Sequence, residues 1–70
     1  MNDFDLRMIF TYHAPKEGQP QKYENLREAG REIAVLIKDL VPDCEEKEIA
    51  INKVREAIMW ANAAIAIHDR

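Results

Sequence analysis

The sequence predicts an all-α fold: an antiparallel helical hairpin with a short N-terminal arm, which assembles into a homo-oligomer. Two long segments carry apolar residues at helical spacing, and the short connection at residues 41–43 forces an antiparallel return between them. Residues 56–67 predict the oligomer, because Asn62 is their only polar residue after Glu56. This run is too short to cross a bilayer, which needs about 20 apolar residues. It is also too apolar for a helix with only one covered face.

The size of the chain strengthens the expectation of a homo-oligomer. Its 70 residues make one domain, near the small end of what folds without disulfides, metal or a partner chain. Cys44 is the only cysteine, so the chain cannot form an internal disulfide. One cysteine and two distant histidines, His13 and His68, cannot assemble a zinc site. We therefore expect no metal and no cofactor, and self-association is the remaining source of stability.

Residues 1–19 are expected to form the N-terminal arm and a loop. A short apolar run at residues 8–10 precedes the loop, which Pro15 and Gly18 interrupt. This segment therefore connects the start of the chain to the first long helix.

The first long helix is expected over residues 20–41. Pro20 suits the first turn, where its missing N–H costs nothing. Pro42 ends the helix because it disfavours helical geometry at the residue before it. The apolar stripe predicted to face the second helix consists of Leu26, Ala29, Ile33, Leu36 or Ile37, and Leu40.

The second long helix is expected over residues 43–68. Asp43 and Glu46 have the spacing of a capping box at its start. The predicted seam toward the first helix has the 3, 4, 3, 4 spacing of a coiled coil and consists of Ile51, Val54, Ile58, Ala61 and Ile65. A second apolar face is predicted to form the interface between subunits, with Ala57, Trp60, Ala64 and Ile67.

Several function classes lack support in the sequence. The chain has no glycine-rich phosphate loop, no His-Glu metal motif and no nucleophile with an adjacent base, so we expect no enzymatic activity. The net charge of −3 argues against binding to duplex nucleic acid. The first five residues contain two acids where a signal peptide is basic, so a cytoplasmic location is expected, with no membrane partner.

Aromatic and basic side chains gather around the loop and along one side of the first helix. They are Tyr12, His13, Lys16, Tyr23, Arg27 and Arg31, and Gly30 borders them. Guanidinium groups bind phosphate and aromatic rings stack on bases, so this group suits an anionic ligand with flat bases. The alternative is a solvated helix face whose neighbouring charges pair with one another. Without further information this alternative is favoured, because such stripes are common on helices.

Four stretches of the chain resemble a known hairpin family: residues 10–20, 22–33, 42–48 and 56–65. The most specific is Glu56-Ala-Ile-Met-Trp-Ala-Asn-Ala-Ala-Ile65, which is not generic helix composition. Together they resemble the phage anti-CBASS sponges, whose hairpin is shared with certain anti-Thoeris sponges. The similarity covers nearly the whole chain.

The resemblance implies a non-enzymatic protein that sequesters cyclic oligonucleotides and so deprives CBASS immunity of its second messengers. The family forms hexamers that bind cyclic dinucleotides, such as 3′,3′-cyclic GMP-AMP (3′,3′-cGAMP), between protomers, and some members also bind cyclic trinucleotides elsewhere. The implied location is the cytoplasm of an infected bacterium. By this resemblance Tyr12 stacks on a base and Arg27 meets phosphate, with Lys16, His13 and Tyr23 as weaker matches. Relatives often carry arginine where this chain has Ile67. Trinucleotide binding therefore stays open here, and it is in doubt if that arginine serves the trinucleotide site.

A competing hypothesis is an oligomeric helical interaction protein. It would bind a host polypeptide through the apolar face of residues 57–67, using Trp60 without needing Tyr12 or Arg27. Nucleic-acid binding is a third class, which the net charge disfavours and which a local basic patch keeps open.

Glutamate in place of Trp60 or Ile67 is expected to break the homo-oligomer and lower the thermal stability together. Burying an unpaired charge at the subunit interface costs several kcal/mol. Light scattering and thermal unfolding of the two variants measure both effects. A wild-type chain that is a folded, stable monomer of 8.1 kDa at micromolar concentration would contradict the prediction.

Overall fold

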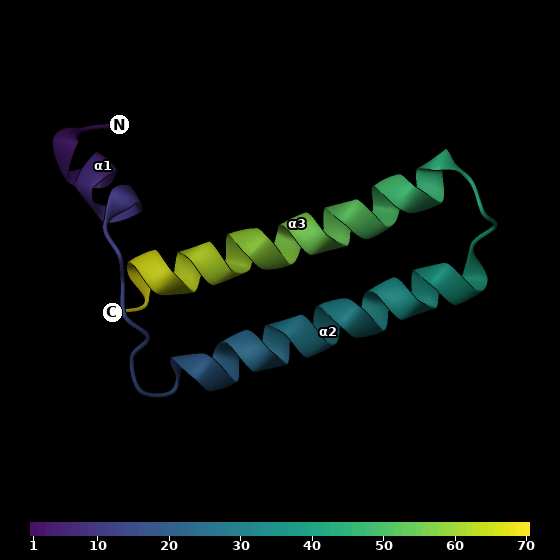
Figure 1. The fold of residues 1–70 in the computed structure, drawn as a ribbon, viewed down its shortest axis with the longest axis horizontal. Helices are drawn as coiled ribbons and strands as arrows, with labels where there is room; N and C mark the ends of the chain where they lie inside the picture. The colour runs from purple at the N-terminus through teal and green to yellow at the C-terminus, as the bar shows by residue number, and fades with distance from the viewer.

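The computed structural model describes all 70 residues and contains three helices: α1 (Asp3–Phe10), α2 (Gln19–Leu40) and α3 (Glu45–His68). α2 and α3 run side by side in opposite directions, and α1 stands beside the open end of this pair, near the C-terminus (Figure 1). The molecule is flat, with principal extents of 45 × 28 × 12 Å. The predicted all-α hairpin is therefore confirmed.

The arm contains a helix, α1, that the sequence analysis did not predict. Asn2 caps it: its side chain accepts a hydrogen bond from the Asp5 backbone N–H at 2.8 Å, and the Asp5 carboxylate accepts one from the Asn2 N–H at 3.3 Å. This reciprocal pair is a capping box with Asp in place of the usual Glu or Gln. No residue of α1 is buried. Helices this short are marginal alone in water, so α1 needs contacts outside itself to persist.

The limits of α2 follow from Gly18 and Pro42. Gly18 precedes the helix with φ of +84°, a left-handed conformation that residues with a side chain rarely adopt. Pro20 lies in the first turn, and Val41 ends the helix directly before Pro42, as the sequence predicted.

The turn between α2 and α3 is closed by Lys47 and not by the predicted capping box. Cys44 precedes the first helical residue of α3 and its side chain makes no capping hydrogen bond, so the assignment of Asp43 and Glu46 to a capping box was wrong. The Lys47 ammonium donates to the Lys38 carbonyl at 2.8 Å and to the Asp43 carboxylate at 2.9 Å. Lys47 is buried, because its long side chain reaches back across the turn to the last carbonyls of α2.

The seam of α3 is the predicted one: Ile51, Val54, Ile58, Ala61 and Ile65 are each partly buried. The seam of α2 differs from the prediction by about a quarter of a turn, at 3.6 residues per turn. Gly30 and Ala34 lie on the side that meets α3, together with Leu26 and Ile37. The predicted residues Ala29, Ile33, Leu36 and Leu40 are exposed.

Gly30 explains this rotation. A Cβ atom at Gly30 would lie only 2.7 Å from Cγ1 of Ile58, so the two helices approach as closely as a glycine allows. Packing the larger side chains of the predicted stripe against α3 would separate the helix axes. The helices instead pack through the close contact between Ile58 and the backbone of α2, and the larger side chains of the predicted stripe stay exposed.

The single hairpin has no fully buried apolar side chain. Its buried residues are Gln19, Gly30 and Lys47, and large apolar residues such as Leu36, Leu40 and Trp60 are exposed to between 57% and 76%. This surface accords with the predicted self-association, which stays a prediction.

Residues near the C-terminus hold the loop before α2 in place. The Gln19 side chain donates to the carbonyl oxygens of Ile65 and Asp69, and it accepts the Lys16 N–H at 2.9 Å. Lys22 Nζ lies 2.6 Å from the Asp69 carboxylate. The Arg70 guanidinium donates to the Ala14 carbonyl. The end of α3 thereby fixes the loop that carries the arm.

Alanine at Gly30 is expected to destabilise the hairpin. Overpacking a close contact costs about 1–3 kcal/mol, which exceeds the gain of up to about 1 kcal/mol from better helix propensity. Urea unfolding measures the difference. Gly30→Ala combined with Ile58→Ala should lose less free energy of unfolding than the two single changes summed, because the clashing atoms are gone. Additive losses would show that the two residues do not limit the approach of the helices.

The contribution of Asp69 to stability is expected to disappear in acid. The hydrogen bond from Lys22 holds the pKa of Asp69 below its usual value of 3.8. The carboxylate therefore stabilises the fold above pH 3.8, and this stabilisation is lost as the pH falls through the lowered pKa. Asp69→Asn and Lys22→Gln should each reduce the free energy of unfolding at neutral pH, and the difference from wild type should vanish in strong acid. A difference that is constant with pH would contradict this assignment.

Candidate functional site

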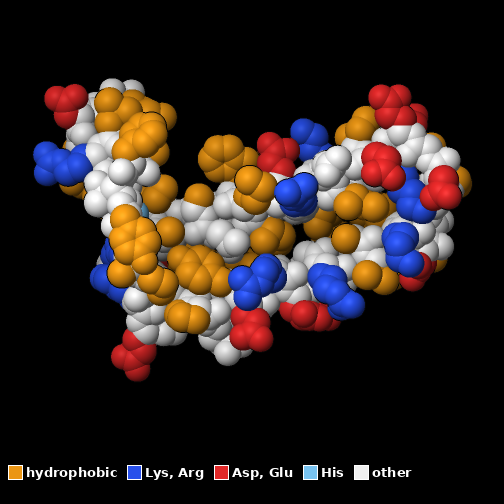
Figure 2. Space-filling model, in the orientation of Figure 1, with side chains coloured by type: hydrophobic (Ala, Val, Ile, Leu, Met, Phe, Trp, Pro, Cys, Tyr) orange, Lys and Arg blue, Asp and Glu red, His pale blue; other side chains and the backbone are white.

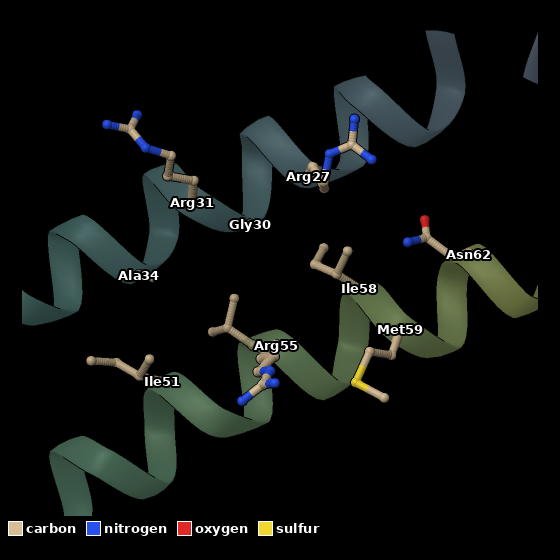
Figure 3. Close-up of a pocket in the computed structure, with 10 residues that line it drawn as sticks. Arg27, Gly30, Arg31, Ala34, Ile51, Arg55, Ile58, Met59 and Asn62 are labelled. Carbon is tan, nitrogen blue, oxygen red and sulfur yellow. The ribbon is translucent and has the colours of Figure 1, made fainter. Parts of the chain in front are cut away.

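A hollow of about 370 Å³ lies between α2 and α3 (Figure 3). It is called the interhelical groove below. Its residues come from both long helices: Arg27, Gly30, Arg31 and Ala34 from α2, and Ile51, Val54, Arg55, Ile58, Met59 and Asn62 from α3.

The spacing along each helix forms this groove. Gly30 and Ala34 are one turn apart on α2. Ile58 packs against Gly30, and the small side chain of Ala34 leaves space next to that contact. Arg27 and Arg31 are also one turn apart and line the hollow from α2, and the Arg31 guanidinium points away from α3 (Figure 3). On α3, residues 55, 59 and 62 follow one side of the helix next to the seam.

The groove is strongly basic within a chain of net charge −3. Three arginines line it and no carboxylate does. Arg27 and Arg55 form no ion pair, while Arg31 reaches Glu28 only at 3.7 Å, with both side chains exposed. Basic side chains stand on both sides of the hollow between the long helices (Figure 2). Such guanidinium groups match phosphate oxygens in geometry and charge.

Asn62 brings an unpaired acceptor to one end of the groove. Its Oδ1 atom is buried and receives no hydrogen bond. An unpaired buried polar atom costs about 1–3 kcal/mol. The arrangement of Asn62 therefore favours a donor from outside the chain.

The predicted site residues do not come together within one chain. Of the five, only Arg27 lines the groove. Tyr12 lies in the loop after α1 and is 84% exposed, and Tyr23 is partly buried on α2 one turn before Arg27. His13 Nε2–H donates to the Met8 carbonyl at 2.7 Å, which fixes the loop against α1. The Lys16 N–H is used by Gln19.

Sequence reasoning missed Arg55 and Asn62 as members of the site, and it missed the burial of Gly30. The sequence places Gly30 only beside the basic and aromatic side chains of α2, whereas the structure buries it against Ile58. Arg55 and Asn62 share one side of α3, seven residues apart, a signal that the sequence contains. Only the contact between Gly30 and Ile58 in the folded hairpin shows that this side of α3 lies next to Arg27 on α2.

A second hollow, of about 480 Å³, separates the arm from the end of α3. It is mostly apolar, and its residues are Met1, Phe4, Asp5, Met8, Ile9, Ile67, His68 and Arg70. Ile67, which was expected at a subunit interface, is partly buried here. Tyr12 does not line this hollow either.

No group of three or more His, Cys, Asp or Glu side chains is placed to hold a metal ion. None of the three helices combines the length and apolar character that a bilayer span requires. The free thiol of Cys44 is exposed at the turn, far along the hairpin from the arm.

Comparison with known proteins identifies the hairpin. The model of the Acb2/Tad1 hairpin domain matches residues 1–66, which include the arm, all of α2 and most of α3. No curated protein and no solved structure matches the chain significantly. This family of anti-CBASS and anti-Thoeris sponges has a general role in binding cyclic oligonucleotides, which implies binding rather than catalysis. The match covers nearly the whole chain, and the protein therefore belongs to the Acb2/Tad1 hairpin family.

Proposed function

We propose that the protein sequesters cyclic dinucleotides such as 3′,3′-cGAMP in the cytoplasm of an infected bacterium and so blocks CBASS immunity. It binds the messenger without hydrolysing it. The observation that carries this proposal is the family match over residues 1–66. The basic groove beside Arg27 supports an anionic ligand independently of that match.

The proposed dinucleotide site uses Tyr12 and Arg27. The Tyr12 ring is 84% exposed and is free to stack on a base. Arg27 is free to bind phosphate, because it forms no ion pair within the chain and borders the groove. The two residues belong to different segments of one chain, so we place the site between protomers, where Tyr12 of one copy approaches Arg27 of another. An isologous interface presents each residue twice, which suits a ligand with two bases and two phosphates.

The proposed assembly is a homohexamer built on the exposed apolar surfaces. The Ile33, Leu36 and Leu40 side chains of α2 lie on the opposite side of its seam from Arg27 and Arg31, by the 3.6-residue period. Association through that apolar side leaves the basic side open to solvent. Trp60 on the back of α3 offers a further contact, as it is 70% exposed.

Alanine at Tyr12 or Arg27 is expected to weaken binding of 3′,3′-cGAMP by about tenfold or more. Stacking on an aromatic ring is worth about 1–3 kcal/mol per base, and a hydrogen bond from arginine to phosphate about 1.5–3 kcal/mol. Calorimetry measures the affinity, and light scattering checks that the assembly is unchanged. Lys38→Ala is the matched control, since Lys38 is exposed on α2 and does not line the groove. Wild-type affinity in both variants would move the site elsewhere.

The same experiment separates a sponge from an enzyme and from an interaction protein. A bound cyclic dinucleotide should be recovered intact when the complex is denatured, whereas a linear product would contradict sequestration. If the wild type binds no cyclic oligonucleotide, the exposed Trp60 surface favours the alternative, a module that binds a host polypeptide through residues 57–67.

A further inference from the structure

We propose that the interhelical groove receives one nucleotide unit of the ligand. Arg31 and Arg55, together with Arg27, bind its phosphate, and Asn62 Oδ1 accepts a hydrogen bond from an N–H of its base. This inference rests on the proposed function for the class of ligand. It adds Arg31, Arg55 and Asn62 to a site for which the family resemblance indicated only Tyr12 and Arg27.

The positive charges that line the groove favour an anionic ligand. Three arginines and no carboxylate are among the residues that line this space of about 370 Å³. The acid next to Arg55 in the chain, Glu56, is paired with Lys53 at 3.3 Å, which leaves Arg55 without a partner. Like charges grouped around an empty space repel one another, and a phosphate between them reverses the sign of that interaction.

The size and walls of the groove suit a single nucleotide. Small-molecule pockets span about 300–1,000 Å³, so 370 Å³ is at the small end and fits one unit of a cyclic oligonucleotide better than all of it. Ile58 and Met59 supply apolar wall next to the arginines (Figure 3). A methionine sulfur packs favourably against an aromatic ring such as a base.

Asn62 supplies the contact for the base edge. Asn62 lines the groove and its buried Oδ1 receives no hydrogen bond, so the group that it lacks is a donor such as a base N–H. A second copy of the chain is a less suitable occupant. The exposed apolar stripe of α2 lies on the other side of the seam, where self-association buries apolar surface without also burying arginines.

Calorimetry with 3′,3′-cGAMP tests the arginines. Arg31→Gln and Arg55→Gln are each expected to weaken binding by about tenfold to a hundredfold, the loss typical of a charge-assisted hydrogen bond. Glutamine keeps the helix propensity of arginine. Lys38→Gln removes the same charge from α2 outside the groove and should change affinity by less than about threefold. Arg27 is left out of this test because it already belongs to the Tyr12 site.

Asn62→Leu separates a ligand contact from a structural one. Leucine removes the unpaired acceptor and keeps the branching and the number of heavy atoms of the side chain, so the melting temperature of the free protein should stay equal or rise. Affinity for 3′,3′-cGAMP should nevertheless fall at least about fivefold. A lower melting temperature with unchanged affinity would overturn the assignment, because Asn62 would then be paired within the assembly.

The remaining outcomes distinguish failure of this inference from failure of the proposed function. If the wild type binds 3′,3′-cGAMP and both arginine variants bind equally well, the groove is overturned and sequestration stands. A change of oligomeric state in Arg55→Gln, seen by light scattering, also overturns it, since a second copy then fills the groove. If the wild type binds no cyclic dinucleotide, the proposed function fails. The groove is then tested by titrating 5′-AMP, where shifts of the Gly30 and Arg55 amide signals support it and their absence overturns it.

Discussion

The close approach of α2 to α3 at Gly30 is the constraint on which the rest of the structure depends. With no side chain at Gly30, Ile58 packs directly against the backbone of α2. This contact sets the rotation of α2, so its larger apolar residues face outward while Ala34 and Gly30 leave a hollow beside the seam. The same rotation brings arginines from both helices to the edges of that hollow. A packing requirement thus produces a basic groove.

The flat hairpin has little interior of its own. It is 12 Å thick along its shortest axis and buries no apolar side chain completely. Small domains generally need a disulfide, a metal or a partner chain to compensate for so little burial. The proposed self-association would supply the missing burial. A fold with so little interior is consistent with membership of a family whose general role is binding.

The arm depends on contacts between opposite ends of the chain. Gln19 and Lys22 at the start of α2 bind Asp69, and Arg70 binds the loop at Ala14. These contacts place the loop that carries Tyr12 beside the end of α3, although α1 itself contributes no buried residue. The arm is therefore positioned by a few polar contacts, and most of its apolar side chains stay exposed.

The sequence by itself determined both long helices, the break at Pro42, the seam of α3 and the family. These follow from local preferences, from a regular apolar period and from motifs that are contiguous in the chain. Only the tertiary structure decided that α2 presents Gly30 and not Leu36 to α3, that Lys47 closes the turn, and that Arg55 and Asn62 join Arg27. The spacing of apolar residues reveals which residues share a face of a helix, but α2 has two adjacent faces that could pack against α3. The choice between them depends on how closely two backbones can approach, which is a property of the pair of helices and of neither one alone.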